Sequence, residues 1–448
     1  MKVTIYLYMM IMLCIVLPVQ SQVQQNNESM KFSLEEARQY ALKNSPVLLN
    51  SARDVEIAKK KIWETTAAGL PQAVLNSSYS YSPKLAGLGQ LFTGGDTTGG
   101  GGGSPFGNFN PDDLKTSFFM NIQVSQLIFN GQYLVGLKAS KVYSGLSELA
   151  ETKSKTGVAE NITNTYFMVL ITREAKEILD STLKTVQKTL FQTQQYYQNG
   201  FLESTDVDQL KILESNIKTR LSVSVRQIDL IDRLLKFQMG IPIDQPIELT
   251  DRIEPLVDGF LMNTQNLDSF RLENNIDYRL LLTQENLTKL NLQAQKSQFL
   301  PTISGFYQRY EDFDNNLFND QSANTFGLTL NFPLWSSGQR LSQVSQRKIE
   351  YLKAKTNTEM AAESLMIQYE TALSEYLSAR DIYTMQKENR DLSLRIFKKS
   401  VTKFSEGVGS SLDLNQAQTQ YLDAEGLYFN SVLSYVSAKA KLETLLAQ

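Results

Sequence analysis

An internal repeat constrains the fold of this chain more than any other feature of the sequence. Two glycines and one aspartate of the first half recur in the second half after the same interval of 207 residues. The pairs are Gly131 with Gly338, Gly200 with Gly407, and Asp206 with Asp413. Pro71 and Pro301 open matching strand-like runs 230 residues apart, so the first copy carries 23 extra residues in a glycine-rich stretch. A chance match would not keep its register over about 75 residues, so we expect one structural unit built twice.

The first 21 residues are typical of a secretory signal peptide. Lys2 precedes an apolar run from Val3 to Pro18, and Val19-Gln20-Ser21 offers a small residue at the cleavage position. The run is too short to span a bilayer comfortably, which disfavours an uncleaved anchor helix. Leu13 precedes Cys14 where a lipoprotein signal would need a small residue, so we reject acylation at Cys14.

The composition argues against most kinds of chemistry. Cys14 is the only cysteine and the chain has no histidine. Zinc sites and the usual nucleophile–base pairs are therefore almost excluded, and we predict no catalytic, metal or cofactor site. The net charge of −3, without a basic cluster, gives no indication of nucleic-acid binding. After Gln22 no apolar run approaches the ~20 residues of a spanning helix. The exported protein is thus either soluble or enters a membrane as strands.

Four segments alternate apolar and polar residues, as strands with two different faces do. They are residues 72–81, 117–129, 302–310 and 326–334. A soluble sandwich would give the same pattern, but each segment is also close to the ~9–11 residues that a tilted strand needs to cross a bilayer. The loop that joins the first two contains Gly94-Gly95-Asp96 and Gly99 to Gly103. No Lys-Ser or Lys-Thr follows these glycines, so we expect an exposed linker and not a phosphate-binding loop.

Two proline-free segments predict very long helices. Tyr133 to Gln198 and Arg340 to Glu406 would each measure roughly 95–100 Å, which a compact globule cannot hold. Their seam residues follow coiled-coil spacing, with steps of three and four. In the second copy these are Leu365, Tyr369, Ala372, Tyr376, Ala379, Tyr383, Leu394, Phe397, Val401 and Phe404, facing Ala417, Tyr421, Ala424, Tyr428, Ser431, Tyr435, Ala438, Leu442 and Leu445. In the first copy Leu179, Leu183, Val186 and Leu190 face Leu210, Leu213, Ile217 and Leu221.

Signals for the starts and ends of helices divide the chain into four parts. Ser33 and Glu36 have the spacing of a capping box, and Pro46 should interrupt the helix that they begin. Met239-Gly240-Ile241-Pro242 ends a helix before an irregular stretch. We predict a signal peptide at 1–21, a first repeat at 22–245, a connecting segment at 246–274 and a second repeat at 275–448. Each repeat reads helix, strand, loop, strand, very long helix, tight turn and long helix.

This layout resembles the outer membrane efflux protein family of TolC-like channel-tunnels, from Ser33 to Gln448. The resemblance rests on the duplicated halves, Leu70-Pro71 and Leu300-Pro301 before the outer strands, the Gly-Gln strand exits, and the matching tips at 200–209 and 407–416. It implies a mixed α and β fold: a trimer in which four strands per protomer build a 12-stranded transmembrane barrel, continued by a long helical barrel in the periplasm. Four strands alone leave open edges, which lipid does not tolerate.

The resemblance also implies a narrow periplasmic entrance at the hairpin tips. Asp206 and Asp413 match the family's tip aspartates, and three copies of Asp413 would make a carboxylate ring that favours cations. Each could equally be a helix N-terminal residue stabilised by the helix dipole, and both roles are compatible. Gln416 stands where a second ring aspartate often lies, Gly409 where a locking arginine can lie, and Phe404 where a tyrosine can bond to the aspartate. A salt-bridged lock is therefore not transferred to this chain.

The same tips are the surface on which family members dock a periplasmic adaptor. The residues that match it are Gly200, Phe201, Leu202, Gly407, Val408 and Leu412. The apolar ones could instead belong to the hairpin core. Closure of the entrance would depend on the packing of Phe404 and Val408.

The function that these features favour is an outer membrane exit duct of a tripartite efflux or secretion system. It would be passive and not an enzyme, coupled through an adaptor to an inner-membrane pump, with outer membrane lipid around its strands. The sequence does not distinguish among drugs, metal ions, and peptides or proteins as cargo. The alternative is a periplasmic coiled-coil adaptor or scaffold, a class that shares the hairpins but lacks four alternating strands.

Overall fold

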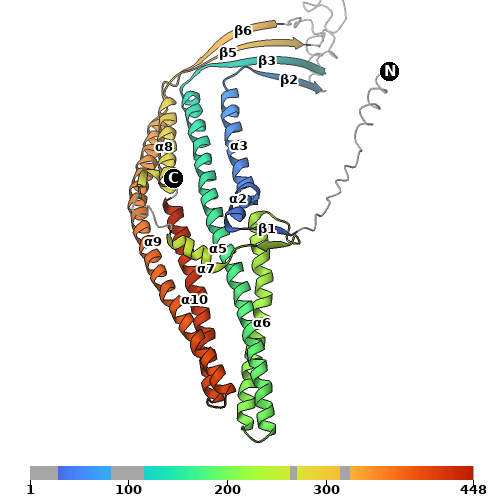
Figure 1. Ribbon diagram of the computed structural model, residues 1–448. Coiled ribbons are helices and arrows are strands. Elements are labelled where there is room, and N and C mark those ends of the chain that lie inside the picture. The colour runs from blue at the N-terminus through green and yellow to red at the C-terminus, as the bar shows by residue number, and fades with distance from the viewer. Residues whose placement is uncertain (1–28, 82–115, 263–269, 313–322, 447–448) are drawn as a thin grey trace, which may run out of the picture.

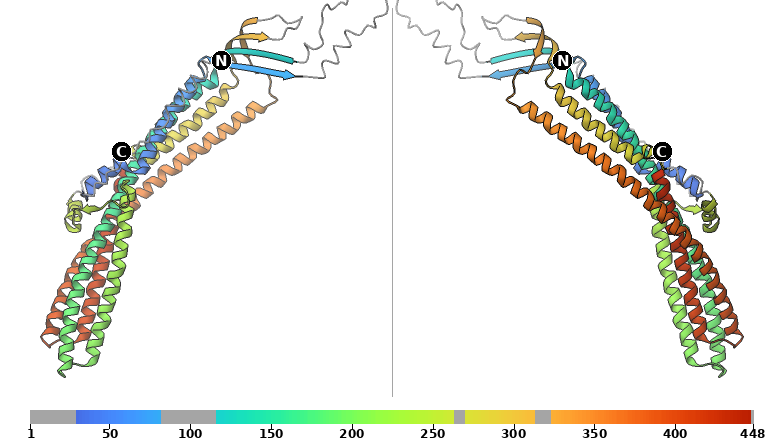
Figure 2. Two further views of the ribbon diagram at one scale, coloured as in Figure 1. Left: turned by 90° about the vertical axis from the view of Figure 1, so that its right-hand side faces the viewer. Right: turned by 90° about the vertical axis from the view of Figure 1, so that its left-hand side faces the viewer.

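The computed structural model describes residues 29–81, 116–262, 270–312 and 323–446 of an elongated chain. Four strands lie at one end, and two helical hairpins reach the opposite end (Figure 1). The helical part bends part-way along its length (Figure 2). The predicted signal peptide and the glycine-rich loop from Gly94 to Gly103 lie outside the described residues.

The elements repeat in the predicted order, with a short segment between the two copies. The first copy and the residues before it contain β1 (Met30–Phe32), α2 (Leu34–Asn44), α3 (Pro46–Ala67), β2 (Gln72–Tyr81), β3 (Thr116–Asn130), α5 (Gly131–Gln198) and α6 (Ser204–Met239). Between the copies lie β4 (Ile247–Leu249), α7 (Ile253–Met262) and η3 (Leu272–Asn274). The second copy contains α8 (Ile276–Ser297), β5 (Thr302–Asp312), β6 (Ala323–Asn331), α9 (Gln339–Ser405) and α10 (Ser411–Leu446). The domain boundaries inferred from the sequence remain predictions.

The strands form one antiparallel sheet in the order β2-β3-β5-β6. Its register gathers most of the apolar side chains on one face: Ala73, Leu75, Tyr79, Phe118, Met120, Ile122, Val124, Ile303, Tyr307, Phe326, Leu328 and Leu330. Arg309 and Glu311 are charged exceptions on this face and form an ion pair. The opposite face carries mainly Gln, Asn, Ser and Thr. Among the described residues β2 and β6 each have one unpaired edge, so the sheet is open on both sides.

The last strand lies three residues earlier in the chain than its alternation suggests, at 323–331 and not 326–334. The prediction ran to Leu334, whereas β6 ends at Asn331. Asn331 pairs with Thr302, the first residue of β5, and Pro301 precedes it. Pro333 also has no N–H to donate, so neither β5 nor β6 can extend their shared ladder of hydrogen bonds.

The long helices pair as two antiparallel hairpins, α5 with α6 and α9 with α10, and α10 also packs on α5 and α6. The two longest, α5 and α9, contain 68 and 67 residues, or roughly 100 Å at 1.5 Å per residue. The Asn275 side chain donates a hydrogen bond to the Leu445 carbonyl at 3.0 Å, so α8 begins where α10 ends. In the same way α3 continues the line of α6 (Figure 1).

Most of the predicted seam residues are buried. The hairpins enclose two clusters, one near the middle of the molecule and one toward the tips. Tyr376, Tyr383, Tyr428 and Tyr435 are among the largest fully buried side chains and form a ladder of ring contacts in the middle cluster. Ala438 and Leu445 are only partly buried.

Within the described part of the chain, no helix combines the length and apolar character needed to cross a membrane.

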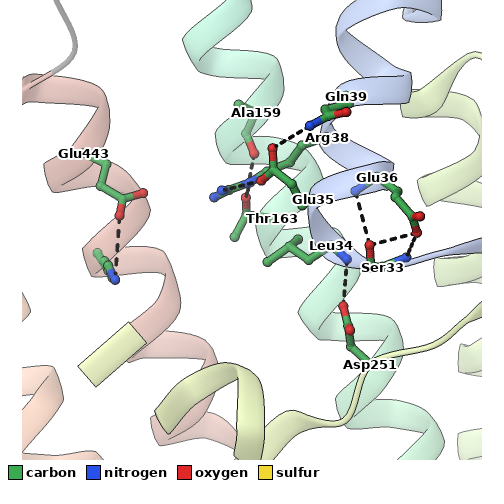
Figure 3. A network of polar contacts seen from close by, with 11 residues as sticks. Ser33, Leu34, Glu35, Glu36, Arg38, Gln39, Ala159, Thr163, Asp251 and Glu443 are labelled. Carbon is green, nitrogen blue, oxygen red and sulfur yellow. Dashed lines mark hydrogen bonds and ion pairs between the residues drawn. The ribbon is translucent and has the colours of Figure 1, made fainter. Parts of the chain in front are cut away.

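The N-terminal helix begins as its sequence predicts. The Ser33 and Glu36 side chains form a reciprocal capping box at the start of α2, and α2 ends before Pro46. Figure 3 shows this cap beside two contacts that anchor α2: the Leu34 N–H donates to Asp251 Oδ2 at 2.7 Å, and Arg38 Nε donates to Thr163 at 2.8 Å.

Residues 246–262, which we call the strap, bind the two halves of the molecule together. β4 pairs in parallel with β1. The Tyr166 hydroxyl lies 2.9 Å from Asp251 Oδ2, which links the strap to α5. Two ion pairs link α7 to α9: Glu254 with Arg390 at 2.8 Å, and Asp258 with Lys387 at 3.3 Å. The strap is therefore a fixed part of the helical body.

Replacing Gly240 with Ala is expected to destabilise the protein more than replacing Gly200 with Ala. Both glycines adopt a positive φ, 77° and 79°, which costs another residue about 1–2 kcal/mol. A Cβ at Gly240 would lie 2.3 Å from the Asn44 carbonyl oxygen, whereas one at Gly200 meets nothing within 4 Å. The midpoints of thermal unfolding would measure the difference. Equal midpoints would show that Asn44 and Pro46, at the junction of α2 and α3, move aside for the added methyl group at no cost in stability.

Candidate functional site at the hairpin tips

The two hairpin turns have the same backbone conformation. Gly200 and Gly407 adopt a positive φ of 79° and 76° after α5 and α9. The N–H of the following residue, Phe201 or Val408, donates back across the turn to the carbonyl five residues earlier, at 2.9 and 3.0 Å. This is the Schellman arrangement that glycine favours. It directs the residues after each glycine away from the helix ends.

Most of the apolar tip residues are exposed. Phe201, Val408 and Leu412 have exposed fractions of 77%, 74% and 63%, while Leu202 is half-buried. In a single chain the hairpin core therefore does not account for the first three. We call these three exposed apolar residues at the two hairpin tips the tip patch.

Asp206 joins the two hairpins. It is the third residue of α6, and its Oδ2 accepts the Glu203 N–H at 3.3 Å as part of a capping box. Its Oδ1 accepts a hydrogen bond from the Ser411 hydroxyl at the start of α10. Ser411 Oγ also lies 3.0 Å from the Gln209 side-chain amide. Asp206 thus caps its helix and contacts the other hairpin.

Asp413 has a different environment although it occupies the equivalent position in the repeat. It is exposed in the first turn of α10, and its backbone N–H donates to the Ser410 hydroxyl at 3.0 Å. Within the described parts of the chain its carboxylate has neither a hydrogen bond nor an ion pair. Gln416, three residues later, is exposed as well. Asp413 is therefore free to face solvent or another copy of the chain.

Phe404 lies inside the hairpin and not at its surface. It is buried in the cluster near the tips, with Leu414, Leu210 and other side chains of both hairpins. A Cβ at Gly409 would lie 3.1 Å from the Phe404 backbone nitrogen. The close approach at this turn explains why glycine suits the position. Phe404 and Val408, which were expected to act together, thus have opposite environments.

Sequence reasoning did not identify Ser411, or the contact that it makes with Asp206. A signal was present: Ser411 lies 207 residues after Ser204, the first residue of α6, so both hairpins place serine at a helix start. The repeat does not, however, say which side chains of one copy meet those of the other.

A hollow of about 1130 Å³ lies higher up, between α5, α9 and the strap. Its lining mixes Arg173 and Lys398 with Glu174 and Glu254. Burial raises the pKa of Glu174, and the nearby charge of Glu254 adds to the effect. The hollow is therefore lined by charges of both signs.

Comparison with known proteins assigns the chain to a protein family. A family model described as outer membrane efflux protein matches residues 37–219 and 272–448, which is most of the chain. The chain belongs to the outer membrane efflux protein family. The stretch between the two matched parts contains the strap. As a member of this family the protein is an outer membrane exit duct of efflux systems, with its helical part in the periplasm.

Relatives match this efflux protein over most of its length. Outer membrane protein TolC of Salmonella enteritidis is 21% identical over 420 residues, which cover 90% of this chain and 79% of the relative. Among solved structures, the Campylobacter jejuni CmeC outer membrane channel superposes with a TM-score of 0.71 at 16% identity, covering 92% of this chain and 85% of that one. The open state of the Neisseria gonorrhoeae MtrE outer membrane channel gives 0.67 at 17% identity, covering 92% and 88%. These likenesses establish the fold.

Proposed function

We propose that three copies of this chain form one duct, with twelve strands closing a barrel in the outer membrane and the hairpins forming a tunnel in the periplasm. The observation that carries the proposal is the open four-stranded sheet with one exposed apolar face. Unpaired strand edges and lipid are incompatible, so the edges of β2 and β6 need partners. Neighbouring copies would supply them.

The duct would be passive, and its energy would come from elsewhere. No catalytic, metal or cofactor site is part of the proposal. We infer that an inner-membrane pump drives transport through a periplasmic adaptor. The tip patch of Phe201, Val408 and Leu412 would receive this adaptor, because large apolar side chains exposed at the end of the molecule are suited to a contact surface. Leu202 and the turn glycines Gly200 and Gly407 would shape the patch.

The entrance would be narrowed by Asp413. Its exposed and unpaired carboxylate, with Gln416 one turn later, is suited to a ring of three around the axis of the trimer. Asp206 would act differently, since its contact with Ser411 holds the two hairpins of one chain together. Phe404 would support the entrance from inside the hairpin.

Conductance in planar bilayers tests both the duct and the ring. The purified protein should run as a heat-sensitive trimer from a detergent extract and should form ion-conducting pores. Asp413→Asn removes three negative charges from the constriction without changing its shape. We expect cation preference to fall and block by multivalent cations from the periplasmic side to weaken, because charges on a narrow axis are poorly screened.

Asp206→Asn is the matched control for this comparison. It removes the same number of charges, but from a side chain already engaged in a cap and a hairpin contact. Its effect on selectivity should be smaller. Unchanged selectivity in a trimeric Asp413→Asn would leave Asp413 as a helix N-terminal residue only. Extraction without detergent would instead support a periplasmic adaptor or scaffold.

A further inference from the structure

One face of α10 lies against the first hairpin and is unusually polar. Residues at intervals of seven along this face are all buried: Ser411, Gln418, Glu425 and Val432, followed by Lys439, which donates to the Phe260 carbonyl of the strap at 3.0 Å. The face meets α6 through the contact of Ser411 with Asp206. A neighbouring row meets α5, where Ser437 donates to Asn164 at 2.9 Å and Thr444 donates to Glu160 at 3.0 Å. We call this contact between the hairpins the inter-hairpin seam.

Two side chains in the seam are buried without satisfying their polar atoms. Gln418 has an exposed fraction of 0%, and neither its amide oxygen nor its amide nitrogen has a hydrogen-bonding partner among the described residues. Glu425 has an exposed fraction of 5%, and its Oε2 is likewise unpaired there. Buried polar atoms in folded proteins are almost always paired, so the packed seam holds groups that water would solvate better.

The charges around Glu425 compensate its buried carboxylate only in part. From α9, Arg390 is committed elsewhere: it donates to Glu254 at 2.8 Å and contacts Asp391 at 2.9 Å, with its guanidinium over the Tyr428 ring. Glu174 on α5 and Asp391 on α9 add negative charge. The hydrogen bond from Tyr421 on the same helix and the positive charge of Arg390 favour the ionised form.

We propose that Glu425 makes the inter-hairpin seam proton-sensitive, so that its ionised carboxylate favours separation of the two hairpins and its protonated form favours their close packing. The inference rests on the proposed duct, because separated hairpins matter only at the entrance of a tunnel. It assigns to Glu425 a positioning role, exerted through the seam, with no contact to cargo.

The direction of the effect follows from the pKa. Burial raises the pKa of Glu425 in the packed seam, with the hydrogen bond from Tyr421 and the charge of Arg390 opposing it. In separated hairpins water would reach the carboxylate and return its pKa toward the ordinary value. The packed seam therefore binds the proton more tightly. Packing is favoured at acid pH and is progressively lost as the pH rises through the raised pKa.

Distances between the tips test this inference. Gln198 and Ser405 are exposed, equivalent residues at the ends of α5 and α9. Nitroxide labels on Gln198→Cys and Ser405→Cys would report hairpin separation in the detergent-solubilised trimer by pulsed electron resonance. We expect a several-fold larger separated population at pH 8 than at pH 5. Glu425→Gln should hold the short distance at both pH values.

Two further variants keep the test decisive. Asp423→Asn, on the exposed side of the same helix two residues away, should respond to pH like the parent. Gln418→Leu removes the unpaired amide and should enrich the short distance while keeping the pH response. A pH response that survives in Glu425→Gln, or none in the parent, overturns the inference. If those preparations still conduct as trimers, the seam inference alone fails; without trimers or conductance, the proposed duct fails.

Discussion

Replacing Leu328 with Arg is expected to abolish most of the assembled trimer in the membrane. Leu328 lies well inside β6 on the apolar face of the sheet, and its exposed fraction is 75% in the single chain. If this face contacts lipid, a charge near the middle of the bilayer costs about 2–4 kcal/mol in each copy. Three copies multiply the cost. The yield of heat-sensitive trimer from the outer membrane fraction measures the effect.

Thr329→Arg is the matched control, since the next residue of the same strand points to the polar face. Its charge would face the water-filled interior, and the trimer yield should stay close to that of the parent. Equal losses in the two variants would mean that lipid does not cover the apolar face. A loss confined to Thr329→Arg would reverse the assignment of the two faces.

The second large effect is expected from Tyr435→Ala in the middle of the helical body. Tyr435 is fully buried, and its ring contacts those of Tyr376 and Tyr383 at centroid distances of 5.6 and 5.7 Å. Truncating a large buried aromatic side chain to Ala typically costs about 3–5 kcal/mol, because the cavity does not close. We expect a large drop in the midpoint of thermal unfolding.

Tyr435→Phe separates the ring from its hydroxyl. The hydroxyl contacts the Tyr376 hydroxyl at 3.4 Å, a long hydrogen bond. Its loss should cost no more than about 1 kcal/mol. A Phe variant as unstable as the Ala variant would show that the hydroxyl, and not the ring, holds the two helices together.

Much of this fold follows from sequence because its signals are periodic and long. The heptad spacing of the second copy predicts the buried faces of α9 and α10, including Tyr376 and Tyr435. Single residues with strict backbone demands were equally informative. Ser33 begins a helix and Gly200 ends a hairpin arm for reasons that hold in any protein.

Pattern was less informative where a side chain's role depends on its partner. Phe404 fits both a coiled-coil seam and a gate, and in the structure it is buried in a cluster to which both hairpins contribute. The equivalent aspartates Asp206 and Asp413 have identical sequence signals but different contacts. The end of β6 depended on Pro301, which lies about thirty residues earlier in the chain and sets where the neighbouring strand begins.

The matched lengths of the helices limit how this chain can change in evolution. α6 and α10 each contain 36 residues, and α5 and α9 differ by one. An insertion in one arm of a hairpin would shift its tip out of step with the other arm. An insertion that preserves the heptad packing would be a whole number of heptads, made in both arms of a hairpin. The length of the helical part in the periplasm can therefore change only in steps. The lengths of the loops are not restricted in this way.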